Sequence, residues 1–126
     1  MLALETLRGL RVVAAPAAFD TMKVVAGIVV LRFAPDDAFV LLEGQLESVE
    51  VDAILVEESG FVGCWLTPAE VASRLVPHIE WPLPTARPVL AQGLIAGVPA
   101  KLWLESSRAL LLCAAPYAHD LAERLA

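Results

Sequence analysis

Few side chains in this sequence could act as nucleophiles or soft metal ligands. They are two cysteines and two histidines: Cys64, Cys113, His78 and His119. No two of them have the short CxxC or HxxxH spacing from which zinc sites are usually built. Three leucines precede Cys113, and apolar surroundings raise the pKa of a thiol and lower its reactivity. We therefore expect no metal site and no cysteine nucleophile, and we interpret these residues as buried thiols and surface imidazoles.

Two pairs of adjacent carboxylates are the candidates for acid–base chemistry. Asp36 and Asp37 lie in a turn, where aspartate is favoured for its hydrogen bonds to the backbone. Glu57 and Glu58 lie in a strand-like run, and neighbours along a strand point to opposite faces, so the two cannot easily share a proton. The glycines lack the spacing of a dinucleotide or phosphate loop. We therefore expect no catalytic residue and no cofactor, and the residues indicate no cofactor-binding position.

The hydrophobic content indicates association with another chain. Hydrophobic residues make up 58% of the 126 positions, above the usual level of about 45–50%. We expect one domain over residues 1–126, and a domain of that size cannot hide so much apolar surface. The surplus predicts an exposed apolar patch, and hence a homo-oligomer or a protein partner.

The apolar runs do not indicate a membrane protein. A spanning helix needs about 20 consecutive apolar residues, and the runs at 24–31, 89–100 and 109–118 are shorter. The first residues show no secretory signal. With only two cysteines, the expected location is the reducing cytoplasm.

The net charge of −6 is concentrated in one segment. Residues 33–73 carry nine acidic side chains and no lysine or arginine. Nucleic acid is an unsuitable partner, because phosphate binding needs a basic face. The acidic belt from Asp36 to Glu58 is either a solvated face or a docking surface that steers a basic partner.

Apolar runs separated by turn residues predict an α+β fold. We expect an antiparallel sheet of about five to seven strands with about two or three helices, mainly on one face. A helical stripe is expected over 2–10, and helices are expected to begin at Thr67 and Pro116. A short strand is expected over 11–15 and a hairpin over 28–43, while 44–52 is read as a loop. Strands 53–57 and 61–66 are expected to pair, and further strands are predicted at 89–94, 98–104 and 109–114.

Two segments of the sequence resemble each other. In the first, Cys64 is followed by Pro68 and an expected helix that ends in Arg-Leu. In the second, Cys113 is followed by Pro116 and an expected helix with the same ending. One interpretation is a duplicated hairpin–helix unit. The alternative is that capped amphipathic helices resemble one another.

The tryptophans suggest where a partner could bind. Trp65 and Trp103 lie in apolar strand runs and are expected in the core. Trp81 lies in a proline-rich linker with Pro82 and Pro84. A tryptophan beside rigid prolines suits an interface, because it offers a large contact area at low entropic cost. These three residues are the interface candidates, and the alternative is that Trp81 packs on the domain's own core.

Three segments resemble a known family. Residues 92–104 and 111–121 resemble the strand, strand and helix of the gamma subunit of bacterial heterotetrameric sarcosine oxidase, a relative of the glycine-cleavage T-protein and its folate-binding fold group. Residues 32–42 are similar to the R-L-x-P-D-E-x-L-L-L hairpin of the same group. The resemblance implies a non-catalytic accessory subunit or interaction module in a flavin-dependent amine oxidase assembly, without a cofactor of its own.

The sequence also departs from that group. Family gamma subunits are longer, and the A-x-x-D-x-S and T-N-D segments of catalytic T-proteins are missing, as is the K-G-C-Y…G-Q-E motif of the folate-dependent iron–sulfur proteins. No active-site residue is therefore carried over. The alternative function is a small folate-type ligand-binding protein linked to one-carbon metabolism, with a pocket lined by Trp103, Tyr117 and either Glu57 or Glu105.

Overall fold

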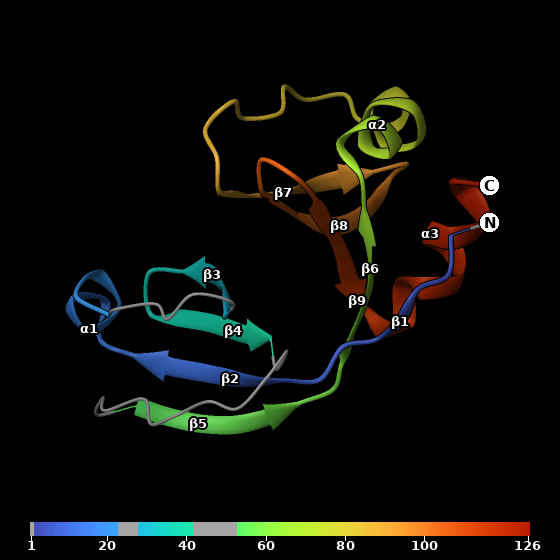
Figure 1. The fold of residues 1–126 in the computed structure, drawn as a ribbon. Coiled ribbons are helices and arrows are strands. Elements are labelled where there is room, and N and C mark those ends of the chain that lie inside the picture. Colours follow the sequence, from blue (N-terminus) through green and yellow to red (C-terminus); the bar gives the residue numbers. More distant parts are fainter. Residues whose placement is uncertain (1, 23–27, 42–52) are drawn as a thin grey trace. The chain divides into compact units, whose positions relative to one another are not determined.

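The strands form two antiparallel sheets, one of five strands and one of four (Figure 1). The computed structural model describes residues 2–22, 28–41 and 53–126. The chain divides into two compact units: unit 1 comprises Met1–Thr6 and Gly60–Ala126, and unit 2 comprises Leu7–Ser59. The α+β class and the antiparallel pairing confirm the prediction, although the strands are divided between two sheets. The expectation of one domain over 1–126 stays a prediction.

Unit 1 is built on the five-stranded sheet, whose strand order is β1-β6-β9-β8-β7. Its long strands are mainly apolar runs, and turn-forming residues adjoin three of them: Gly60 and Thr67 flank β6, Pro88 precedes β7 and Gly97 precedes β8. The strands are β1 (Glu5–Thr6), β6 (Phe61–Leu66), β7 (Val89–Ile95), β8 (Val98–Leu104) and β9 (Ala109–Ala114).

One face of this sheet forms the core of unit 1. Alternate residues of β9, namely Ala109, Leu111 and Cys113, are at most 2% exposed and pack in this core. Two residues from the helical segments that follow β6 and β9, Leu75 and Leu121, belong to the same core cluster. Because side chains alternate across a strand, Leu110 and Leu112 belong to the opposite face.

The first helical segment begins as predicted at Thr67. Its hydroxyl accepts a hydrogen bond from the Glu70 amide at 3.1 Å, and the Glu70 carboxylate accepts one from the Thr67 amide at 3.1 Å. This capping box starts α2 (Pro68–Glu70), which continues as a π-helical turn, η1 (Val71–Leu75), and a 3-10 turn, η2 (Val76–His78).

The second helical segment follows β9. It consists of a 3-10 turn, η3 (Ala115–Tyr117), and α3 (Ala118–Arg124). The helix predicted at Pro116 is therefore present, with its first turn tighter than an α-helix. No helix among the described residues is long and apolar enough to cross a membrane.

Unit 2 contains the four-stranded sheet, in the order β3-β4-β2-β5. The strands β3 (Val29–Ala34) and β4 (Asp37–Leu41) form the predicted hairpin around the Pro35-Asp36 turn. The strand β2 (Gly9–Ala14) lies between β4 and β5 (Ala53–Glu58). The short helix α1 (Pro16–Asp20) places Phe19 in a cluster with Val12 and Val40.

Two sequence-based predictions are wrong. Residues 2–10 are not helical: they contain β1 and the start of β2, and Gly9 leaves no room for a side chain beside the Phe39 ring. The strands at 53–58 and 61–66 exist but do not pair with each other, because β5 pairs with β2 whereas β6 pairs with β1 and β9. The first copy of the suggested hairpin–helix unit therefore has no hairpin. The last residues of the predicted hairpin, 42–43, and the predicted loop at 44–52 lie outside the described residues.

Candidate functional site

A cleft of about 340 Å³ lies at one end of the five-stranded sheet, within unit 1. It is bounded by the start of α2 and by the turn that joins β8 to β9. Its wall is mixed, since apolar side chains alternate with two arginines and one glutamate. The lining residues are Pro68, Val71, Arg87, Leu104, Glu105, Ser106, Arg108 and Ala109.

Arg108 and Glu105 anchor a polar cluster at this cleft. The Arg108 guanidinium carbon lies 3.6 Å from the centre of the Trp65 ring, a close cation–π contact. The Arg108 Nε donates to the Glu105 carboxylate at 3.1 Å, and the Trp103 indole Nε1 donates to the same carboxylate at 2.8 Å. The four side chains come from β6, β8 and the turn that joins β8 to β9, and they form one connected set.

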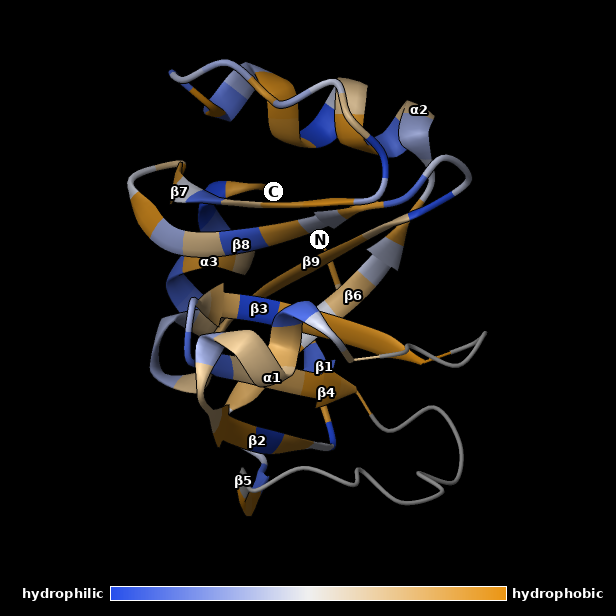
Figure 2. Cartoon of the chain, turned by 90° about the vertical axis from the view of Figure 1, so that its left-hand side faces the viewer, coloured by the Kyte–Doolittle hydropathy of each residue, from blue (hydrophilic) through white to orange (hydrophobic). Residues whose placement is uncertain are grey.

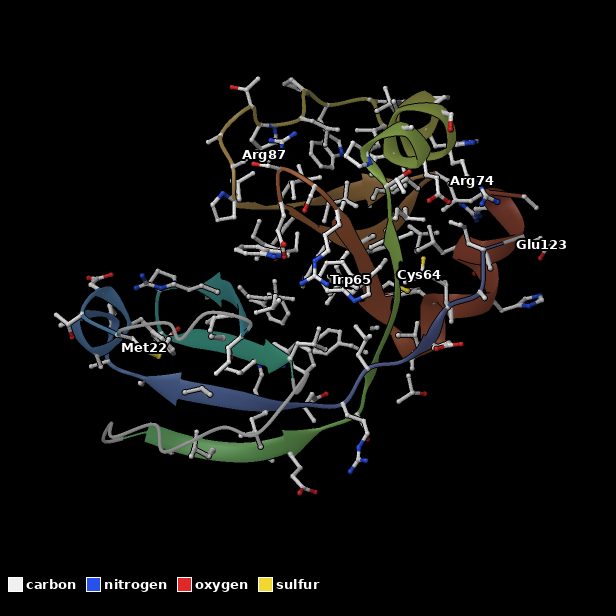
Figure 3. All side chains as sticks on the ribbon, viewed as in Figure 1. Met22, Cys64, Trp65, Arg74, Arg87 and Glu123 are labelled. Atoms are coloured by element: carbon white, nitrogen blue, oxygen red, sulfur yellow. The ribbon has the colours of Figure 1, made fainter. Side chains whose placement is uncertain are left out.

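The register of the strands explains why these side chains meet. Trp65 and Trp103 both lie directly opposite Leu110 in the sheet, one on each side of β9. Directly opposite residues share a face, so both indoles lie on the face away from the helical core. Figure 3 shows Trp65 and Cys64 pointing to opposite sides of β6. Both tryptophans are half-buried rather than fully buried core residues.

Arg87 supplies the second cation of the cleft. It lies in the loop before β7 (Figure 3), and its Nη1 donates to the carbonyls of Pro84 and Ala86 at 2.7 Å each. Arginine is well suited to bind carboxylates. The arrangement can therefore hold a small carboxylate next to an apolar wall, with Glu105 already accepting two hydrogen bonds.

The cysteines and histidines do not gather into a reactive centre. Burial raises the pKa of Cys113 to about 11 and also raises that of Cys64. His78 and His119 are exposed, and the His119 Nε2 lies 3.3 Å from the Glu123 carboxylate one helical turn away. Within residues 2–22, 28–41 and 53–126, no group of three His, Cys, Asp or Glu side chains is arranged to hold a metal ion.

The two pairs of adjacent carboxylates, Asp36 with Asp37 and Glu57 with Glu58, do not form an acid–base site. The Asp37 carboxylate accepts two hydrogen bonds from the Arg11 guanidinium, each at 2.6 Å, and this partner lowers the pKa of Asp37. Asp36 is exposed in the turn. Glu57 and Glu58 lie at the end of β5, on opposite faces of the strand as expected.

Trp81 packs on the sheet of its own unit. Its indole Nε1 donates to the Leu94 carbonyl at 2.9 Å, and its ring lies so close to Gly93 that a Cβ there would come within 2.6 Å of it. Pro82 is exposed and Pro84 is half-buried. The role of these three residues as an interface stays a prediction.

Sequence reasoning did not predict the contacts of Glu105 and Arg108 with the tryptophans. Glu105 had been named only as a carboxylate for a folate-type pocket; Tyr117, named with it, is 42% exposed on η3 and does not line the cleft. One signal was present: a glutamate and an arginine three apart in a tight turn, with Trp103 two residues before it. The contact with Trp65 depends on the pairing of β6 with β9, which the sequence does not reveal.

No family model matches the chain, and no curated protein matches it. Among solved structures, the chain is similar to one chain of the heterotetrameric sarcosine oxidase from Corynebacterium sp. U-96, solved in complex with pyrrole 2-carboxylate. The match has a TM-score of 0.71 and 15% sequence identity, and it covers 97% of this chain and 79% of that chain. At this identity the likeness shows a shared fold. The fold class is therefore that of a sarcosine oxidase chain.

Proposed function

We propose that this protein is a non-catalytic accessory subunit, similar to sarcosine oxidase gamma, of a flavin-dependent amine oxidase assembly. The observation that carries the proposal is the fold likeness to a chain of a heterotetrameric oxidase, which extends over 97% of this chain. The resemblance of residues 92–104 and 111–121 to gamma subunits supports the choice of subunit.

Exposed apolar surface also supports a role in an assembly. Seven large apolar side chains are more than two-fifths exposed in the part of the chain that the structure describes. Exposed apolar residues that cluster are the usual mark of a contact surface. They are Val13, Ile54, Leu55, Val56, Val76, Leu94 and Tyr117.

The polar cluster has a structural role in this proposal. Arg108 contacts Trp65 and donates to Glu105, and Glu105 accepts from Trp103. These contacts connect β6 and β8 to the turn that leads into β9. The linker residues Trp81, Pro82 and Pro84 remain candidates for a subunit contact. The proposed location is the cytoplasm, where free thiols such as Cys64 and Cys113 stay reduced.

The test is to isolate the tagged chain from its own host and to measure the mass, the flavin absorbance and the sarcosine-dependent oxygen consumption of what elutes. The proposal expects a complex several times the mass of the chain, coloured by flavin and active with a secondary amine. The purified chain alone should be colourless and inactive. A monomer or homodimer that elutes without flavoprotein, and instead binds a folate analogue at stoichiometric level, would contradict the proposal and favour the ligand-binding alternative.

A further inference from the structure

The strand β5 offers an unpaired backbone edge. It pairs with β2 on one side, and among the described residues no strand pairs with its other side. In Figure 1 it is the outermost strand of its sheet. An edge strand exposes a row of backbone donors and acceptors that can pair with a strand of another chain. The geometry of the exposed groups therefore suits a strand rather than a small molecule.

The side chains of this edge are apolar and exposed. Ile54 is 66% exposed, Leu55 47% and Val56 55%, and Figure 2 shows the orange, hydrophobic colouring of β5. Val13, which lies opposite Ile54 on β2, is 41% exposed. Ile54, Val56 and Val13 share one face of the sheet, and Leu55 lies on the other. A strand placed beside β5 would cover apolar side chains on both faces.

The negative charge around β5 favours a different protein, rather than a second copy of this chain, as the partner strand. The exposed apolar residues are followed by Glu57 and Glu58 at the end of β5. Residues 7–59 carry nine acidic and four basic side chains, a formal charge of −5. Two copies joined through β5 would bring two such charges together. Like charges near each other across strands are destabilising, whereas opposite charges are favourable.

We infer that β5 binds an edge strand of a different protein, in antiparallel alignment, whose sequence carries two basic residues followed by apolar β-forming residues. The alignment follows from the sheet, in which every pair is antiparallel. In this alignment the basic residues of the partner lie opposite Glu58 and Glu57, and its apolar residues lie opposite Val56, Leu55 and Ile54. The partner strand supplies both the missing hydrogen bonds and the cover for the apolar side chains.

The test uses the full chain, labelled with ¹⁵N, and a blocked peptide of two lysines followed by alternating valine and threonine. Binding should shift the amide resonances of β5 and β2, and raising the salt concentration should weaken it. The same peptide with glutamates in place of the lysines should bind at least about tenfold more weakly. A peptide methylated on alternate backbone nitrogens should not bind, because it cannot complete the ladder.

Two variants of the chain test the side chains. The pair Ile54→Thr and Val56→Thr keeps residues that favour strands and should weaken lysine-peptide binding about tenfold. The pair Glu57→Lys and Glu58→Lys should reverse the preference, so that the glutamate peptide binds better. Leu94→Thr, which changes a residue 56% exposed on β7, is the matched control and should leave binding unchanged.

Three outcomes would overturn the inference: equal binding of the lysine and glutamate peptides, resonance shifts away from β5 and β2, or a homodimer that Ile54→Thr with Val56→Thr disrupts. The last outcome would identify a second copy as the occupant. That the partner belongs to an oxidase assembly rests on the proposed function. An isolated flavoprotein complex that the β5 variants leave intact contradicts only this inference. Peptide binding at β5 without any flavoprotein complex contradicts only the proposed function.

Discussion

The guanidinium of Arg108 stacks on the Trp65 ring at 3.6 Å while its Nε donates to Glu105 at 3.1 Å. The two contacts join β6 to the turn between β8 and β9. Because Glu105 also accepts a hydrogen bond from the Trp103 indole, Arg108 is linked through it to β8 as well as to β6. Substitutions at this position therefore test how much the polar cluster contributes to the fold.

Arg108→Ala should lower the free energy of unfolding by about 1–2 kcal/mol, the sum expected for one partly exposed cation–π contact and one surface ion pair. Arg108→Lys should recover less than half of this loss, since lysine lacks the planar group that stacks on the ring. Arg87→Ala is the matched control, because its hydrogen bonds go to nearby backbone carbonyls. Urea unfolding measures all three, and equal losses for Arg108→Ala and Arg87→Ala would contradict the prediction.

Gly93→Ala should destabilise the chain by about 1–3 kcal/mol, because the new Cβ would lie 2.6 Å from the Trp81 ring and force it to move. The change should also alter the tryptophan fluorescence of the folded chain. In a Trp81→Ala background the same substitution should cost much less. Thermal unfolding of the four proteins gives the coupling between the two sites, and additive losses would show that the ring does not pack on Gly93.

Ala96→Asn should stabilise the chain by about 0.5–1 kcal/mol. Ala96 has φ 51° and Gly97 φ 77° in the two-residue turn between β7 and β8, and asparagine tolerates this left-handed conformation better than alanine. Gly97→Ala should do the reverse, because its Cβ would also lie 2.9 Å from the Arg124 Nη1. Unfolding by urea compares the two, and a loss of stability in Ala96→Asn would contradict the prediction.

Asp37→Asn should remove a stabilisation of about 1 kcal/mol that depends on pH, since it breaks a partly buried ion pair in which Arg11 donates two hydrogen bonds. The pKa of Asp37 is lowered in the folded chain. Its contribution is therefore fully present above the unfolded pKa of about 4 and is lost as the pH falls below it. The difference in stability between wild type and Asp37→Asn should be largest near pH 7 and should shrink toward pH 3. A constant difference would contradict the role of the carboxylate.

Cys113 should resist alkylation at neutral pH. Its pKa of about 11 keeps the thiol protonated at pH 8, and Cys64, which is less buried, should react first. Because folding raises this pKa, the stabilisation from the buried thiol is fully present below about pH 9 and is lost as the pH rises toward 11. Mass spectrometry of iodoacetamide-treated chain measures the order, which unfolding in urea should abolish. Fast modification of Cys113 at pH 8 in the folded chain would contradict the prediction.

Local signals in the sequence determined several elements well. The strands at 98–104 and 109–114 have the predicted bounds, and the hairpin around Pro35-Asp36 was expected from the turn. Thr67 and Glu70 form the capping box that their spacing indicates. These features depend on interactions between residues within about four positions of one another, so they can be predicted from the local sequence alone.

Only the tertiary structure decided which strands pair and what the cleft contains. β5 and β6 are neighbours along the chain, yet they belong to different sheets. Trp81 packs over Gly93, and Arg108 meets Trp65, because the strands and the linker that carry them are brought together by long-range pairing. Strand pairing is determined by burial over the whole sheet. The local sequence of a strand therefore does not identify the distant strand with which it pairs.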